Sequence, residues 1–80
     1  MTEREVYAGL TEIVRELFGD DTIVLSATTT ANDVDGWDSF NHLNIIAAAE
    51  MKFGVKFRTK EIEKLTNIGE MVGLILQKTR

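Results

Sequence analysis

The chain has 80 residues, no cysteine and no proline, and a formal charge of −4 at pH 7. A chain this short builds a small hydrophobic core, which leaves little material for an enzyme pocket walled on all sides. The lack of cysteine excludes disulfides, thiolate nucleophiles and zinc–cysteine sites. We therefore expect residues 1–80 to form a single domain that is stabilised by packing alone.

Acidic and basic side chains are distributed unevenly along the chain. Residues 1–50 contain ten acidic and two basic side chains, whereas residues 51–80 contain three acidic and seven basic ones. A nucleic-acid-binding module needs a basic stripe that neutralises phosphates. The candidate is the run Lys56, Arg58, Lys60 and Lys64. It is better interpreted as the solvated side of a short helix, so no nucleic-acid partner is expected.

The first ten residues, "MTEREVYAGL", carry charges where a signal peptide has an apolar run. No segment of the sequence approaches the length and hydropathy of a membrane span. We therefore expect a cytoplasmic protein that is a monomer and has no membrane span.

The first predicted helix covers residues 2–18. Thr2 followed by Glu5 is typical of a capping box. Gly19 is expected to end the helix, because glycine readily takes the left-handed conformation that closes a helix. Apolar side chains recur at helical spacing between these ends, at Val6, Leu10, Ile13, Val14 and Leu17.

Residues 19–37 are predicted to form a long ordered loop. Their segment "TIVLSATTT" is rich in β-branched residues and by propensity alone could be a strand. No second strand is available to pair with it, and a lone strand would leave its backbone groups unpaired. We expect Ile23, Val24 and Leu25 to anchor the loop on the helices. Loops of this length often have a functional role.

The second helix is predicted to start at Asp38, whose side chain can cap the first turn, and to run to Phe53 before Gly54. A short helix over residues 60–65, entered from Thr59, should follow.

The last helix is predicted to begin after Asn67, which with Glu70 forms a second box-like cap, and to run to near the C-terminus. The sequence thus predicts an all-α fold, with three main helices, one short helix and a long loop between the first two helices.

The second helix has apolar residues on two sides. At about 100° per residue, two separate apolar arcs result. One arc contains Ile45, Ile46, Ala49 and Phe53, and the other contains Phe40, Leu43, Ala47 and Met51. The first arc suffices to pack against the other helices. The second is either a docking surface for partners or is covered by another helix, and the pattern alone leaves both open.

Ser39, in "DVDGWDSFNHL", stands where the second helix begins. A serine hydrolase is not indicated, because the glycine–x–serine–x–glycine elbow is absent and His42 is the only histidine. A calcium loop with Gly36 at its sixth position would place Ala31 and His42 where acidic ligands are needed. We therefore expect no catalytic residue and no metal site.

Covalent attachment of a phosphorylated group to Ser39 is a third possibility. A serine in the first turn lies near unpaired backbone N–H groups and the positive end of the helix dipole, which favour a phosphodiester. The alternative is that Asp38 and Ser39 are simply good residues for a helix start. The residues alone leave both open.

Three segments, "GWDSFNHLNII", "EMKFGVKF" and "EIEKLTNIGEMVGLI", resemble the acyl carrier protein family over nearly the whole chain. The resemblance implies a four-helix bundle of acyl-carrier type. It places Ser39 at the motif serine that carries a 4′-phosphopantetheine arm, and Asp38 at the preceding aspartate, as helix cap and transferase recognition residue. The usual leucine position of the motif is Phe40. Glu50 and Phe53 match a glutamate and an aromatic of the family's second helix.

The resemblance implies a carrier rather than an enzyme. A phosphopantetheinyl transferase would transfer the arm from coenzyme A, and the arm's thiol would hold an acyl group as a thioester. The implied partners are the transferase, an acyl-loading ligase or synthase, and acyl-processing enzymes of fatty-acid, lipid or specialised acyl metabolism.

The partner surface implied by the resemblance departs from that of housekeeping fatty-acid carriers. Asn41, Asn44 and Met51 stand where acids are common, which should shift recognition from charge toward apolar contact. The expected surface comprises Trp37, Phe40, Asn41, Leu43, Asn44, Ala47, Glu50 and Met51. We hypothesise a dedicated carrier for a particular acyl group. The alternatives are an aminoacyl or D-alanyl carrier, or a helical interaction module without a prosthetic group.

Overall fold

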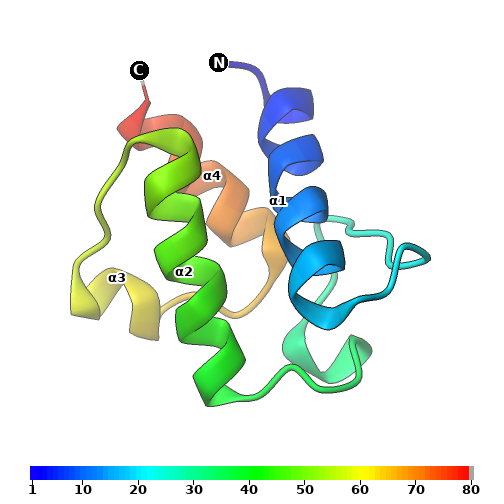
Figure 1. Ribbon diagram of the computed structural model, residues 1–80. Helices are drawn as coiled ribbons and strands as arrows, with labels where there is room; N and C mark the ends of the chain where they lie inside the picture. Colours follow the sequence, from blue (N-terminus) through cyan, green and yellow to red (C-terminus); the bar gives the residue numbers. More distant parts are fainter. Residues whose placement is uncertain (80) are drawn as a thin grey trace.

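The structure, a computed structural model that describes residues 1–79, is built from α-helices (Figure 1). The elements are α1 (Glu3–Phe18), η1 (Ala31–Asp33, a single 3₁₀ turn), α2 (Ser39–Phe53), α3 (Thr59–Glu63) and α4 (Ile68–Lys78). No strand occurs within the described part of the chain. The predicted all-α fold, with three main helices, one short helix and a long loop after the first, is confirmed.

The ends of α1 and α4 follow from local hydrogen bonding. The Glu5 N–H donates to the Thr2 hydroxyl oxygen at 3.2 Å, and the Thr2 N–H donates to Glu5 Oε1 at 3.0 Å, which is the predicted capping box. Gly19 closes α1 with a φ of 64°, in the left-handed region. At the start of α4 the Glu70 N–H donates to Asn67 Oδ1 at 2.8 Å.

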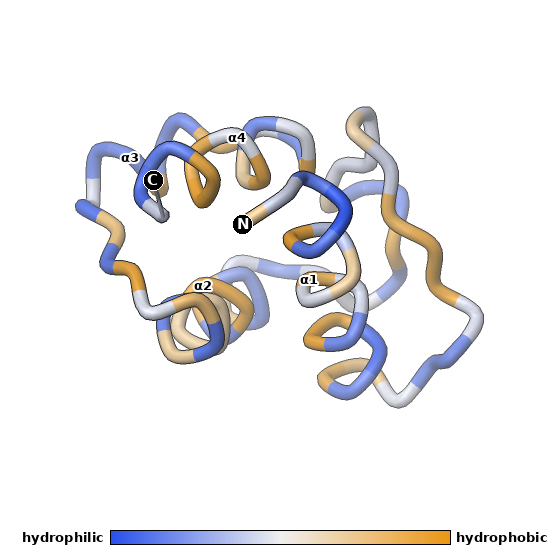
Figure 2. The backbone as a smooth tube through the Cα atoms, turned by 90° about the horizontal axis from the view of Figure 1, so that it is seen from above, coloured by the Kyte–Doolittle hydropathy of each residue, from blue (hydrophilic) through white to orange (hydrophobic). Residues whose placement is uncertain are grey.

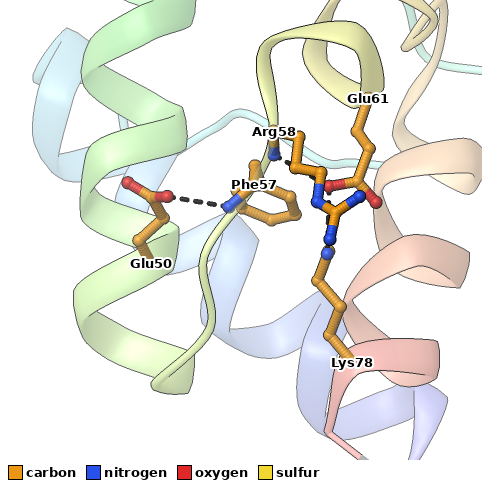
Figure 3. Close-up of polar contacts among 5 residues, drawn as sticks. All are labelled: Glu50, Phe57, Arg58, Glu61 and Lys78. Atoms are coloured by element: carbon orange, nitrogen blue, oxygen red, sulfur yellow. Dashed lines mark hydrogen bonds and ion pairs between the residues drawn. The ribbon is translucent and has the colours of Figure 1, made fainter.

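The short helix α3 begins and ends earlier than the predicted range of 60–65. The Arg58 N–H donates to Glu61 Oε1 at 2.8 Å, so that Thr59 already lies in the first turn (Figure 3). The Leu65 N–H donates to the Ile62 carbonyl at 3.2 Å, a tighter spacing than that of an α-helix. The helix therefore ends at Glu63.

The hydrophobic core lies among α1, α2 and α4, which surround a common interior when seen from above (Figure 2). Its fully buried side chains come from all three helices. They include Val6, Leu10 and Val14 of α1, Ile45 of α2, and Ile68, Met71 and Ile75 of α4. The arc of α2 predicted to pack inward is confirmed, since Ile45, Ile46 and Ala49 are buried and Phe53 packs partly against the core.

The loop between α1 and α2 is anchored on the core by two of its three predicted apolar residues. Leu25 is buried and Ile23 is half-buried, but the prediction for Val24 is wrong, because its side chain is 76% exposed. In an extended segment, successive side chains point to opposite sides. Since Ile23 and Leu25 point inward, Val24 must point to solvent.

The 3₁₀ turn η1 within this loop was not predicted. The Thr30 N–H donates to Asp33 Oδ2 at 2.9 Å, which stabilises a turn too short to show a hydrophobic period.

The same loop is held against the first turn of α4 by backbone hydrogen bonds. The Ile68 N–H donates to the Thr29 carbonyl at 2.9 Å, and the Gly69 N–H donates to the Ala27 carbonyl at 3.0 Å. A Cβ atom on Gly69 would lie 2.8 Å from the Ala27 oxygen. The loop can therefore approach α4 this closely only because residue 69 has no side chain.

Gly69→Ala should lower the free energy of unfolding by about 1–3 kcal/mol, because the added methyl group forces the loop away from α4. Gly73→Ala, one turn further along the same helix, is the matched control. A Cβ atom there meets no atom within 4 Å, so alanine should raise stability by about 0.5–1 kcal/mol. Urea unfolding of both variants measures the difference. Equal stabilisation by both substitutions would contradict the close contact of loop and helix.

Candidate functional site

Ser39 is the first residue of α2, and its side chain is exposed. The preceding Asp38 is extended and accepts a hydrogen bond at Oδ1 from the Asn41 N–H at 2.8 Å. The carboxylate thereby satisfies one of the free N–H groups of the first turn. The predicted cap is confirmed, and it fixes the place at which the Ser39 hydroxyl leaves the helix.

The loop that leads into this cap is held by Asn41. Its Nδ2 donates to the Gly36 carbonyl at 2.7 Å, and Gly36 has a φ of 87°, which a residue with a side chain adopts only with strain. Asn41 was predicted as a partner contact. Its amide folds the entry of α2 back on itself, and the partner contact of Asn41 stays a prediction.

Trp37 and His42 are joined across the helix start. The Trp37 indole N–H donates to His42 Nδ1 at 3.2 Å, and the two ring centroids lie 6.2 Å apart. On its other side Trp37 packs against Phe18 of α1, with ring centroids 6.1 Å apart. Partial burial lowers the pKa of His42, because it disfavours the charged imidazolium. The site thus contains a neutral imidazole that Trp37 holds in place.

No periodic pattern in the sequence predicts the pairing of Trp37 with His42. The sequence predicts that the Trp37 side chain contacts partners and that His42 is a partly exposed helix residue rather than a general base. Helical periodicity does not report a bond between a loop residue and the helix that follows it. The sequence feature that could have indicated the pair is the spacing of Trp37 and His42. They lie five residues apart, one before and one after the helix cap Asp38.

A pocket of about 270 Å³ opens beside Ser39. It lies between the loop before α2, the first turn of α2 and the start of α4. Its wall includes Trp37, Ser39 and His42 on one side and Leu65, Ile68 and Met71 on the other. This volume is just below the range of about 300–1,000 Å³ that is usual for small-molecule sites.

The second apolar arc of α2 is not covered by another helix. The side chains of Phe40, Leu43 and Met51 are 72%, 57% and 86% exposed, and Ala47 and Asn44 are exposed as well. Of the two possibilities left open by the pattern, the uncovered face is the one found. Exposed apolar side chains grouped on one face are a feature of interaction surfaces.

Glu50 lies at the edge of this face but turns toward the connection between α2 and α3. Its Oε2 accepts a hydrogen bond from the Phe57 N–H at 2.9 Å, as Figure 3 shows. A second carboxylate, that of Glu61, receives the Arg58 N–H and lies 3.0 Å from Lys78 Nζ of α4. Glu50 thus holds the α2–α3 connection, and its predicted contact with partners stays a prediction.

Within residues 1–79, no group of three or more His, Cys, Asp or Glu side chains is placed to hold a metal ion. No helix of the described chain is long and apolar enough to cross a membrane.

The protonation of His42 should make stability depend on pH. Because burial lowers its pKa in the folded state, the unfolded chain binds this proton more readily. The favourable contribution is present above the usual His value of about 6.5 and is lost as the pH falls below it. We expect the stability of the wild type to decrease relative to His42→Gln between pH 7.5 and pH 5.5 in urea unfolding. If the free energies of unfolding of the wild type and of His42→Gln depended on pH in the same way, a lowered pKa of His42 in the folded state would be contradicted.

Comparisons of sequence place the chain among known proteins. No family model matches it. An acyl carrier protein of Myxococcus xanthus is 35% identical over 74 residues, which cover 92% of this chain and 94% of the relative. An acyl carrier protein of Beutenbergia cavernae is 37% identical over 76 residues, covering 92% and 90%. One of Acidothermus cellulolyticus is 30% identical over 79 residues, covering 99% and 94%.

Comparison of the fold with solved structures also finds an acyl carrier protein. The solution NMR structure of the holo acyl carrier protein from Geobacter metallireducens matches with a TM-score of 0.85 and 42% sequence identity, over 91% of this chain and 84% of that one. Similarity of sequence and fold along almost the whole length shows that the chain belongs to the acyl carrier protein family, whose members are not enzymes and carry a phosphopantetheine prosthetic group.

Proposed function

We propose that this chain carries 4′-phosphopantetheine, derived from coenzyme A, on the Ser39 oxygen and presents an acyl group to partner enzymes. The observation that carries the proposal is the place of Ser39, exposed at the first position of α2 and directly after the Asp38 cap. This is the position of the motif serine in the family that the chain resembles. The arm's thiol supplies the thioester linkage that a cysteine-free chain cannot form by itself.

The surroundings of Ser39 suit the prosthetic group. The hydroxyl lies at the positive end of the α2 dipole, which favours a phosphodiester. The adjacent pocket of about 270 Å³ gives the first part of the arm space beside the helix. The Asp38 carboxylate serves as the helix cap through Oδ1. Activation of the serine is left to the phosphopantetheinyl transferase, which we propose reads Asp38 as part of the attachment site.

The uncovered face of α2 is proposed as the surface that partner enzymes read. It combines Phe40, Leu43, Ala47 and Met51 with the neutral Asn44. An apolar face of this kind selects partners by shape and desolvation more than by long-range charge. We therefore propose a cytoplasmic, monomeric carrier dedicated to a particular acyl group, with its own loading ligase or synthase and its own processing enzymes.

Incubation with coenzyme A and a broad-specificity phosphopantetheinyl transferase tests the attachment. The intact mass of the wild type should increase by one phosphopantetheine, and that of Ser39→Ala should stay unchanged. The chain contains a second serine, Ser26, so Ser26→Ala is the matched control and should gain the arm in full. An unmodified wild type, or a modified Ser39→Ala, would contradict the proposal. In that case a helical interaction module without a prosthetic group would be the better interpretation.

Acidic substitutions on the uncovered face test whether the carrier is dedicated to its own partner enzymes. The double variant Asn44→Glu with Met51→Glu should react severalfold faster with general fatty-acid synthase enzymes than the wild type at low salt, since acids steer a carrier toward basic patches. The gain should disappear at high ionic strength because of screening. Gln77→Glu, at an exposed position of α4, adds acid elsewhere and should have little effect. A wild type that already matches a housekeeping carrier would refute the idea.

A further inference from the structure

Ser39 and His42 lie on the same side of the first turn of α2. They are three residues apart, a spacing at which Cβ atoms on a helix are about 5–6 Å from each other. Both side chains line the same pocket. A group attached to the Ser39 oxygen and directed along this pocket must therefore pass the imidazole.

The hydrogen bond from Trp37 determines which nitrogen of His42 carries a proton. Because Nδ1 accepts the indole N–H at 3.2 Å, the neutral ring must carry its proton on Nε2. Trp37 is itself packed against Phe18, so the imidazole is held from the loop side and from α1. The result is an oriented N–H donor at the wall of the pocket.

The other polar side chains of the pocket wall already have partners. Asp38 accepts from the Asn41 N–H, Thr29 from the Ser26 N–H, and Asn67 from the Glu70 N–H. The remaining two threonines of the wall each donate to a carboxylate, Thr30 to Asp33 and Thr66 to Glu70. The Asn67 Nδ2 remains a second side-chain N–H donor of the wall, but it lies at the start of α4. The His42 Nε2–H lies in the same turn of α2 as Ser39, so it is the donor nearer to the start of a group attached there.

Few charges act on His42 from the surrounding elements. Among the described residues of the pocket wall, the one other ionisable side chain is Asp38, at the helix start. The loop contributes threonine, alanine and tryptophan, and the segment that leads into α4 contributes Leu65, Thr66, Asn67, Ile68 and Met71. A new negative charge beside the imidazole would therefore dominate its titration.

We propose that His42, positioned by Trp37, donates a hydrogen bond from Nε2 to the phosphodiester of the group carried by Ser39, and thereby directs the start of the arm along the pocket. This inference rests on the proposed attachment at Ser39. It assigns His42 as a positioning residue for the prosthetic group, and Trp37 as the residue that orients His42.

The proposal has a consequence that can be measured without any partner enzyme. A phosphodiester in contact with the imidazole favours the imidazolium, so modification should raise the pKa of His42, opposing the effect of burial. The chain has one histidine and one tryptophan, and the modified form has one phosphorus atom. The histidine, tryptophan and ³¹P signals therefore need no assignment among several residues.

The experiment compares apo and phosphopantetheinylated protein by ¹⁵N and ³¹P NMR between pH 5 and pH 8. We expect the pKa of His42 to rise by about one pH unit on modification. A phosphodiester does not titrate in this range, so its ³¹P signal should shift with the same midpoint as His42. In His42→Gln, modified to the same extent, the ³¹P signal should not depend on pH.

The variant Trp37→Phe tests whether His42 must be oriented by Trp37 or needs only to lie close to the phosphodiester. It keeps an aromatic ring against Phe18 but removes the N–H donor, so the His42 ¹⁵N signals should change from one tautomer to a mixture. The rise in pKa on modification should become smaller.

The outcomes distinguish this inference from the function on which it rests. The wild type could gain the arm while the pKa of His42 is unchanged by modification and the ³¹P signal does not depend on pH. That result would overturn the inference and leave the attachment at Ser39 standing. If no arm is added to the wild type, both are overturned. Should His42→Gln fail to fold, the comparison of apo and modified wild type decides the question alone.

Discussion

The structure depends on the fact that α2 has two apolar faces and the domain can cover only one of them. Burial of a large aliphatic side chain contributes about 1.5–3 kcal/mol, and Ile45 and Ile46 are almost fully buried on the inner face. The small Ala49 allows close packing on the same face. The other helices, α1, α3 and α4, do not provide enough material to surround α2, so the opposite face remains in contact with water. An apolar surface that folding does not bury is available for binding.

The same constraint places Ser39. Once Ile45 and Ile46 fix the rotation and position of α2 against α1 and α4, the beginning of the helix must emerge beside the loop and the first turn of α4. The loop cannot drift from this position, because Ala27 and Thr29 accept backbone hydrogen bonds from α4. The exposed Ser39 is thus held at a defined corner of the domain.

The sequence predicts the main helices well, because their ends are determined by contacts over three or four residues. The caps at Thr2, Asp38 and Asn67 and the terminating glycines are local signals. The boundaries of α3 were less accurate, since its start depends on Glu61 reaching back to a backbone N–H. A single 3₁₀ turn such as η1 leaves no periodic pattern to detect.

The candidate site was predictable in part. The position of Ser39 and the Asp38 cap follow from the helix-start pattern, and the uncovered arc follows from the spacing of apolar residues. The Trp37–His42 bond could not be predicted from periodicity, because it depends on the path of the loop before α2. That path is in turn set by Gly36 with its positive φ and by the Asn41 amide that holds its carbonyl.

Two of the polar residues around the uncovered face of α2 are hydrogen-bonded within the fold. Of the polar side chains predicted to contact partners, Asn41 donates to the loop before α2 and Glu50 accepts from the connection after it. Both side chains are therefore hydrogen-bonded within the fold, one at each end of α2. The neutral Asn44 is left beside Phe40, Leu43 and Met51. A surface of this composition offers little long-range electrostatic attraction. Its exposed apolar side chains are a feature of surfaces that bind by apolar contact.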